Sequence, residues 1–269
     1  MSKDPAKWVG FDMDECVGVT HYLYPFARTF VPRDARLIPA SGFFTASIKA
    51  LAKSEIRRNT GYLRPALFPV LRSLYAAWKS GRIAGAFMFS NNSNHALVEL
   101  VRQLLNTIMG LQHGLPHPPL IVQMAVSAQT PERTASSLKD WDGIVACLKS
   151  RGLAPPVRKQ DLLFYDDMPH ALERQIPHYC RVPKYTYVTP QALFVALIAP
   201  LVPPDLEAQW KECRQELLAL DHSVSSIIPT TDRGTVPMTT ALQQFVSHVT
   251  QTRSRRTLRR RTRKNRRHV

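Results

Sequence analysis

The sequence predicts an α/β protein with a doubly wound, mostly parallel sheet, and three observations support this prediction. Apolar runs of strand length alternate along the chain with segments whose apolar residues recur at helical spacing. The runs are continuous rather than alternating, which is typical of parallel strands that are covered on both faces. Three of the runs end in conspicuous polar side chains, and the carboxyl ends of parallel strands share one edge, where ligands bind.

The chain opens with a strand and an excursion. The apolar lead of residues 8–12 predicts the first strand. The excursion over 19–61 is rich in Tyr, Phe, Pro and Arg, and it has no clean period apart from one predicted helix over 47–58. We interpret it as a lid or flap over the loop after the first strand, held down by its aromatic side chains.

The next elements alternate regularly. A helix begins near Pro65, a residue type favoured in the first helical turn, and ends at Gly81. The run 83–89 predicts the second strand, and the polar residues 90–94 cap a helix whose apolar face extends to residue 108. The remaining core elements are a strand over 120–126, a helix over 141–150 and a strand over 162–165.

The C-terminal third changes in character. Helices over 190–199 and 205–220 are expected to pack on the outside of the sheet. A loop then leads to a short helix over 239–250, and the composition from residue 253 onward predicts disorder. The expected units are a core with the sheet and the excursion (1–190), C-terminal helices (191–221), a linker with a short helix (222–252) and a basic tail (253–269).

Composition limits the kind of protein. The chain has 269 residues, of which 44% are hydrophobic, enough for one large domain with a core. No apolar run approaches the roughly 18 residues of a membrane span, and residues 1–7 are polar, so we expect an intracellular protein without a membrane partner. The four cysteines lie far apart without metal-ligand spacing, so we expect reduced thiols and neither disulfides nor a zinc site.

The net charge of +16 is concentrated in the tail. Residues 253–269 carry ten positive charges and no acid, which leaves +6 for the rest of the chain. Such a segment binds nucleic acid through counterion release with little sequence selectivity. It could equally act as a nuclear-localisation signal or contact an acidic partner.

Two acids, Asp12 and Asp14, stand where the first strand turns polar. Two carboxylates at one buried spot repel each other and lose hydration, which costs several kcal/mol unless a cation compensates. Hard oxygen ligands suit Mg²⁺, which completes its shell with water and substrate phosphate. The alternative is an aspartate-rich turn without such a role. The second and fourth strands end in Ser90 followed by Asn91 and in the pair Asp166 and Asp167.

Three of these segments resemble motifs of the haloacid dehalogenase (HAD) superfamily of phosphotransferases, over about residues 8–183. FDMDECVG resembles the first motif, an apolar run followed by DxDx(T/V), except that Cys16 replaces the usual Thr or Val. FMFSNNS resembles a strand that ends in Ser or Thr, and LLFYDDMPH resembles a strand that ends in an acid pair. The resemblance implies a minimally capped, Rossmann-like HAD fold for residues 1–190.

The resemblance also implies a role for each acid. Asp12 would be the nucleophile that forms an aspartyl-phosphate, and Asp14 would be the general acid and then the general base. The presence of Asp14 points to phosphomonoester hydrolysis rather than dehalogenation. Mg²⁺ would be held by Asp12, the backbone carbonyl of Asp14 and one of Asp166 and Asp167.

Phosphate binding follows from the same resemblance. Ser90 and Asn91 would bind a phosphate oxygen at a helix N-terminus, unless Ser90 is only the N-cap of the next helix. The third family motif is a lysine that neutralises the phosphate. Lys139, 27 residues before Asp166, fits the spacing of small members, while Lys159 is the alternative and either could be a surface lysine.

A large cap domain is not visible in the sequence. In this respect the chain resembles the branch of the family that acts on macromolecular phosphates, including phosphoproteins and nucleic-acid ends. The leading hypothesis is therefore a Mg²⁺-dependent phosphomonoester hydrolase with such a substrate. The alternative is a catalytically inactive HAD-fold binding or structural protein, attached to nucleic acid by residues 253–269.

Overall fold

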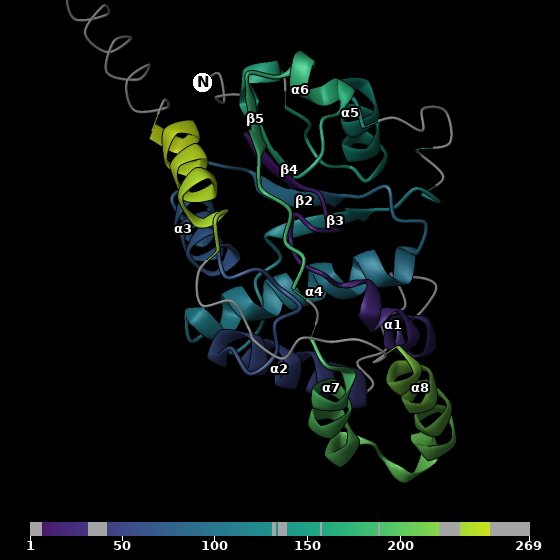
Figure 1. Cartoon of the computed structure of the whole chain (residues 1–269). Helices are drawn as coiled ribbons and strands as arrows, with labels where there is room; N and C mark the ends of the chain where they lie inside the picture. Colours follow the sequence, from purple (N-terminus) through teal and green to yellow (C-terminus); the bar gives the residue numbers. More distant parts are fainter. Residues whose placement is uncertain are drawn as a thin grey trace, which may run out of the picture.

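The computed structural model describes residues 7–31, 42–130, 133, 139–156, 158–187, 189–220 and 232–247. Their central feature is a five-stranded, all-parallel sheet with the order β3-β2-β1-β4-β5 (Figure 1). The strands are β1 (Trp8–Phe11), β2 (Gly85–Phe89), β3 (Val122–Val126), β4 (Leu162–Asp166) and β5 (His178–Arg181). The predicted parallel α/β architecture is confirmed, although β5 was not among the predicted strands. The predicted basic tail, residues 253–269, lies outside the described residues.

The register of β1 determines which residues meet at the edge of the sheet. Phe11, the last residue of β1, pairs with Met88 of β2 and with Tyr165 of β4. Both pairings are parallel, so the strands end at the same edge. Asp12, which follows β1, therefore lies beside Asp166, the last residue of β4.

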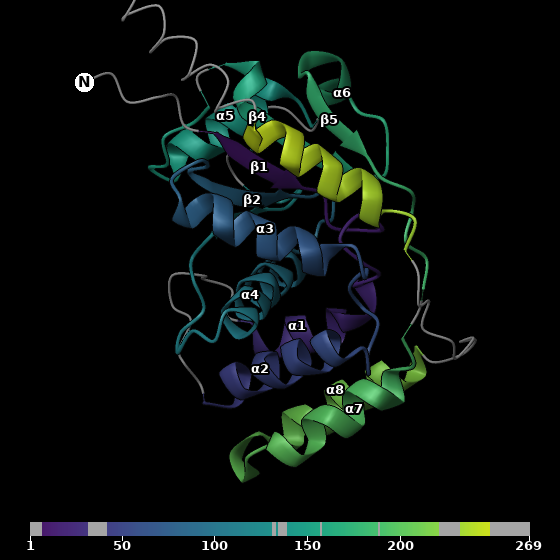
Figure 2. The ribbon, with the colours of Figure 1, turned by 90° about the vertical axis from the view of Figure 1, so that its left-hand side faces the viewer.

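Helices cover both faces of the sheet (Figure 2). One face carries α3 (Leu67–Lys79), α4 (His95–Gln112) and a helix over 235–247, and the other carries α5 (Trp141–Ser150) and α6 (Ala171–Gln175). Successive side chains of β1 alternate between the two apolar clusters, with Val9 and Phe11 in one and Trp8 in the other. At Gly10 a Cβ atom would lie 2.3 Å from the ring of Phe164, so this position has room only for glycine.

Two further helical layers lie beyond α4 (Figure 2). Helices α1 (Tyr24–Phe30) and α2 (Gly42–Arg57) pack against α4, and α7 (Gln191–Ile198) and α8 (Glu207–Ala219) pack against α1 and α2. The ring centroids of Phe26 on α1 and Phe194 on α7 are 5.3 Å apart. The described residues of the excursion thus form two α-helices where one was predicted, and the C-terminal helices lie on the excursion instead of directly on the sheet.

The excursion leaves and rejoins the core through one short pairing. The N–H of Val19 donates to the carbonyl of Tyr62 at 2.9 Å, and the N–H of Arg64 donates to the carbonyl of Val17 at 3.0 Å. Gly18 sits inside this pairing, where a Cβ atom would lie 1.9 Å from the Tyr62 carbonyl oxygen. The close approach of the two segments therefore requires glycine at this position.

The helix over 235–247, predicted as 239–250, completes one face of the sheet (Figure 2). Its residues Met238, Leu242 and Phe245 are buried in the larger apolar cluster. The hydroxyl of Tyr165 on β4 donates to the carbonyl of Met238 at 2.8 Å, and Lys7 Nζ donates to the carbonyl of Phe245 at 2.9 Å. This C-terminal segment is therefore part of the core.

Buried Arg64 joins the same segment to the loop after β1. Its guanidinium forms a bidentate ion pair with Asp232, with both N···O distances at 2.9 Å. It also donates to the carbonyls of Cys16 and Pro183, at 3.0 and 2.8 Å. The side chains of Arg64 and Asp232 are only 1% and 3% exposed. Arg64 thus supports the loop that carries the first two aspartates.

Two expectations from composition, on membrane spans and on the cysteines, can be compared with the described residues. Among them, no helix has both the length and the apolar character needed to cross a membrane. All four cysteines are free thiols, and Cys16, Cys147 and Cys213 are buried.

Candidate active site

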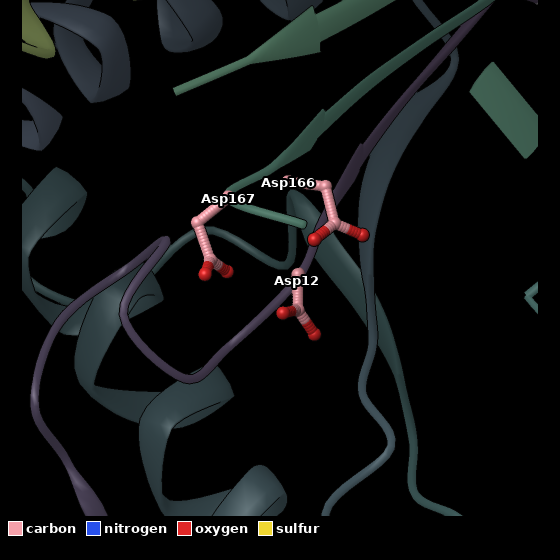
Figure 3. Close-up of side chains that lie close together, drawn as sticks. All are labelled: Asp12, Asp166 and Asp167. Carbon is pink, nitrogen blue, oxygen red and sulfur yellow. The ribbon is translucent and has the colours of Figure 1, made fainter. Parts of the chain in front are cut away.

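Three carboxylates meet at the carboxyl edge of the sheet. Asp12 directly follows β1, Asp166 ends β4 and Asp167 comes next. Figure 3 shows the three side chains lying close together at the ends of these neighbouring strands. One oxygen of each carboxylate lies within 4.8 Å of those of the other two, and all three residues are buried. Oxygen donors placed in this way could hold a metal ion.

Lys139 lies against two of these carboxylates. Its Nζ is 2.6 Å from Asp12 Oδ1 and 3.0 Å from Asp166 Oδ2, and the residue is 2% exposed. It immediately precedes Asp140, the N-cap of α5, so the start of that helix fixes its position. Lys159 is exposed and lies in the turn before β4, at the opposite edge of the sheet. Of the two candidate lysines, Lys139 is the one that contacts the acids.

The three carboxylates carry more negative charge than Lys139 balances. If all are ionised, its ammonium leaves two negative charges at a buried site, which is unfavourable without a further cation. The Nζ of Lys184 lies 3.8 Å from Asp167 Oδ2, but it is half-exposed and its charge is screened. Burial raises the pKa of Asp12, against the opposing effect of Lys139, and burial also raises the pKa of Asp167. The donor set therefore fits a divalent cation.

Asp14 lies in a tight turn over residues 13–18. The N–H of Cys16 donates to the backbone carbonyl of Asp14 at 2.6 Å, and Glu15 adopts a left-handed φ of 58°. The carbonyl predicted as a metal ligand thus already accepts one hydrogen bond. Burial raises the pKa of the Asp14 carboxyl. Burial also raises the pKa of the Cys16 thiol well above its ordinary value, so this thiol is inert at neutral pH.

Ser90 is buried at the end of β2, and its Oγ accepts the N–H of Asn92 at 3.0 Å. Helix α4 is capped by Asn94, whose Oδ1 accepts the N–H of Leu97 at 3.1 Å. Ser90 is therefore not the N-cap, and it precedes the first turn of α4 instead of belonging to it. Because its oxygen acts as an acceptor in this bond, its hydroxyl hydrogen can make a further bond.

Arg133 was not singled out by the sequence. Its guanidinium donates to the carbonyl of Ser90 and to the side-chain oxygen of Asn91, and it lies 4.5 Å from the centroid of the Phe89 ring. The residue is 2% exposed. Arg133 therefore adds a buried positive charge beside the two residues predicted to bind phosphate. No motif spacing marks this arginine, so the sequence held no signal for it.

Asn92, which the sequence grouped with the helix-capping residues, contacts Asp14 instead: its Nδ2 donates to Asp14 Oδ2 at 3.1 Å.

The seven residues singled out by the sequence are Asp12, Asp14, Ser90, Asn91, Lys139, Asp166 and Asp167. They come from the carboxyl ends of three neighbouring strands and the start of α5. No family model, curated protein or solved structure matches the chain.

A metal site at the acid cluster predicts stabilisation by divalent cations. We expect MgCl₂ to raise the melting temperature of the wild-type protein, because binding to the folded state alone adds about 3 kcal/mol at a hundred times Kd. Asp167→Asn should remove most of this shift, since it deletes one ligand charge. Thermal unfolding followed by circular dichroism, with NaCl of matched ionic strength as reference, measures the effect.

The control for this measurement is Asp142→Asn, which changes an exposed aspartate of α5. It should keep the full shift with MgCl₂. An undiminished shift in Asp167→Asn would show that the cation binds elsewhere.

Proposed function

We propose that the chain is a Mg²⁺-dependent phosphomonoester hydrolase of the HAD type that works through an aspartyl-phosphate. One observation carries the proposal: Asp12 stands at the end of the central strand, paired with Lys139 and grouped with Asp166 and Asp167. This arrangement gives a nucleophilic carboxylate one fixed cation and a place for a second. Phosphoryl transfer needs such positive charge beside the attacking oxygen.

The residues of the chain supply the nucleophile and the proton donor and acceptor for both chemical steps. In the first, an oxygen of Asp12 attacks phosphorus, the P–O bond to the leaving group breaks, and Asp14 gives its proton to the leaving oxygen. In the second, water attacks the phosphorus of the aspartyl-phosphate, Asp14 takes the water's proton, and phosphate leaves as the Asp12 carboxylate is restored. Bound Mg²⁺ would supply charge neutralisation between the nucleophile and the phosphate.

Phosphate recognition is assigned to Ser90, Asn91 and Lys139. Lys139 contacts Asp12 and can neutralise a phosphoryl oxygen brought to it. Arg133 donates to the Ser90 carbonyl and to the Asn91 amide oxygen and so holds the other two in place. Asn91 and Met168, which follow β2 and the acid pair, are exposed, and such a border favours a macromolecular phosphate, on a protein or at a nucleic-acid end.

The test is a screen of the purified chain against phosphopeptides, 3′- and 5′-phosphorylated oligonucleotides and small phosphate esters. We expect release of inorganic phosphate with MgCl₂ and loss of release with a chelator, because the excess negative charge of the acid cluster opposes phosphate binding without a cation. Release that persists in the chelator would contradict the metal requirement. If none of the substrates released phosphate, the proposed enzymatic function would be wrong, and the alternative of a catalytically inactive binding protein would be favoured.

A further inference from the structure

Asn92 connects the turns that follow three strands, and each of its polar groups is engaged. Its carbonyl accepts the N–H of Ala128, after β3, at 2.9 Å, and its N–H donates to Ser90 Oγ at 3.0 Å. Its side-chain Oδ1 accepts the N–H of Asn94 at 2.8 Å, and its Nδ2 donates to Asp14 Oδ2 at 3.1 Å. Three hydrogen bonds to other groups therefore fix the position of Asn92, and the fourth joins it to Asp14.

These contacts decide which way the Asn92 amide faces. The oxygen and nitrogen of an asparagine side chain have nearly the same shape, so the hydrogen-bond network assigns them. A backbone N–H on one side requires the amide oxygen, and a carboxylate on the other side requires the NH₂ group. If the amide were flipped, its NH₂ group would face the N–H of Asn94 and its oxygen would face the carboxylate of Asp14, and neither contact could form a hydrogen bond. Asn92 is thus a fixed donor to Asp14.

The contact also distinguishes the two oxygens of Asp14. Oδ2 accepts from Asn92, whereas Oδ1 is buried and has no hydrogen-bond partner within the described part of the chain. When the carboxyl is protonated, the proton sits on Oδ1, because Oδ2 already faces a donor. Oδ1 is therefore the oxygen of Asp14 that is left to carry the proton.

We propose that Asn92 is the positioning residue for the general acid: it holds Asp14 Oδ2 and thereby reserves Oδ1 for the proton. This inference rests on the phosphatase function proposed above. Rotation about the last side-chain bond of an aspartate is broad, so an unheld carboxyl samples orientations in which Oδ1 points elsewhere. A well-placed general acid contributes about 10²- to 10⁴-fold to the rate, and most where the leaving oxygen is strongly basic.

The test compares two esters with different leaving groups. 4-Nitrophenyl phosphate releases a weakly basic phenolate that departs without a proton, whereas glycerol 2-phosphate releases an alkoxide that needs one. In Asn92→Ala, kcat/KM for glycerol 2-phosphate should fall at least about 30-fold, against less than about 3-fold for 4-nitrophenyl phosphate. A loss caused only by a weakened fold would lower both values equally, so the ratio identifies the positioning role.

Two further variants make the comparison decisive. Asp14→Asn should show the same selective loss, and adding Asn92→Ala to it should change the ratio by less than about twofold, since Asn92 acts through Asp14. Asn94→Ala, which removes the α4 cap but keeps the N–H that holds Asn92, should lower the melting temperature and leave the ratio unchanged.

Each contrary outcome has its own meaning. Equal losses on both esters in Asn92→Ala, or a selective loss that is undiminished in the Asp14→Asn background, would overturn the positioning role while the phosphatase function stands. A wild-type protein that hydrolyses neither these esters nor any phosphopeptide or phosphorylated oligonucleotide of the screen would overturn the proposed function, and the inference with it.

Discussion

Replacing Asp12 by asparagine is expected to lower kcat at least about 10⁴-fold for any phosphomonoester that the wild-type protein hydrolyses. An amide oxygen is a far weaker nucleophile than a carboxylate and does not form the aspartyl-phosphate. Binding of Mg²⁺ should also weaken, as expected for Asp167→Asn, because the change removes one ligand charge from the acid cluster, so turnover is compared at saturating MgCl₂. Steady-state release of phosphate measures turnover, and calorimetry with orthophosphate and MgCl₂ measures binding.

The control for this result is Asp142→Asn, the same exchange at an exposed position of α5. Its kcat should stay within about twofold of the wild-type value, as is usual for a surface substitution. If Asp12→Asn kept more than about a tenth of the wild-type kcat, the loss would be too small for a missing nucleophile, and the covalent mechanism would be wrong.

The second large effect concerns stability: Asp232→Ala is expected to lower the free energy of unfolding by about 3–5 kcal/mol. The change leaves the guanidinium of Arg64 buried without its carboxylate. Burial opposes ionisation of Asp232, yet hydrogen bonds from Arg64 and from two backbone N–H groups hold the pKa of its carboxyl below the ordinary 3.8. The stabilisation that ionised Asp232 provides is therefore complete at pH values above 3.8, and it is lost as the pH falls through the lower pKa of the folded state.

Urea unfolding at neutral pH and in acid measures this dependence, and the difference between wild type and Asp232→Ala should shrink in acid. The control is Glu216→Ala, which removes the partner of the half-exposed Arg28. Little change is expected there, because solvent screens exposed ion pairs. A loss below about 1 kcal/mol in Asp232→Ala at neutral pH would mean that the ion pair with Arg64 contributes little to the fold.

Sequence patterns predicted strands only where the apolar run is continuous. β2 and β3 lie within the predicted runs and β4 exceeds its predicted run by one residue, Asp166, because all but one of the residues in these strands are buried. β5, with the sequence HYCR, lies at the edge of the sheet, and its residues are half-buried or exposed. A short edge strand with mixed polarity has no pattern that separates it from a loop.

Helices whose partners are other helices were harder to predict than helices on the sheet. Phe26 of α1 packs against the rings of Phe43, Phe44 and Phe194, so α1 depends on residues distant in sequence instead of on one regular apolar stripe. The helix over 235–247 was expected, but not its place in the core. That place depends on Tyr165 and other residues far along the chain.

The residues of the candidate site likewise fall into those whose grouping could be predicted from the sequence and those whose contacts could not. Residues at strand ends could be predicted to meet, because parallel pairing fixes their relative positions, and the grouping of Asp12 with Asp166 and Asp167 is confirmed. The contacts of Asn92 and Arg133 depend on how neighbouring turns fold against each other, which spacing does not encode. The enzymatic roles of these residues stay predictions until turnover is measured.

The burial of the helix over 235–247 has a consequence for biosynthesis. Lys7 and Phe245, whose contact ties this helix to the start of β1, lie 238 positions apart. A ribosome therefore makes all five strands of the described sheet before it makes the helix that packs on Tyr165. Contacts of such long range slow folding, and an uncovered apolar face favours aggregation. We therefore expect this apolar face to stay exposed on the nascent chain until the helix emerges.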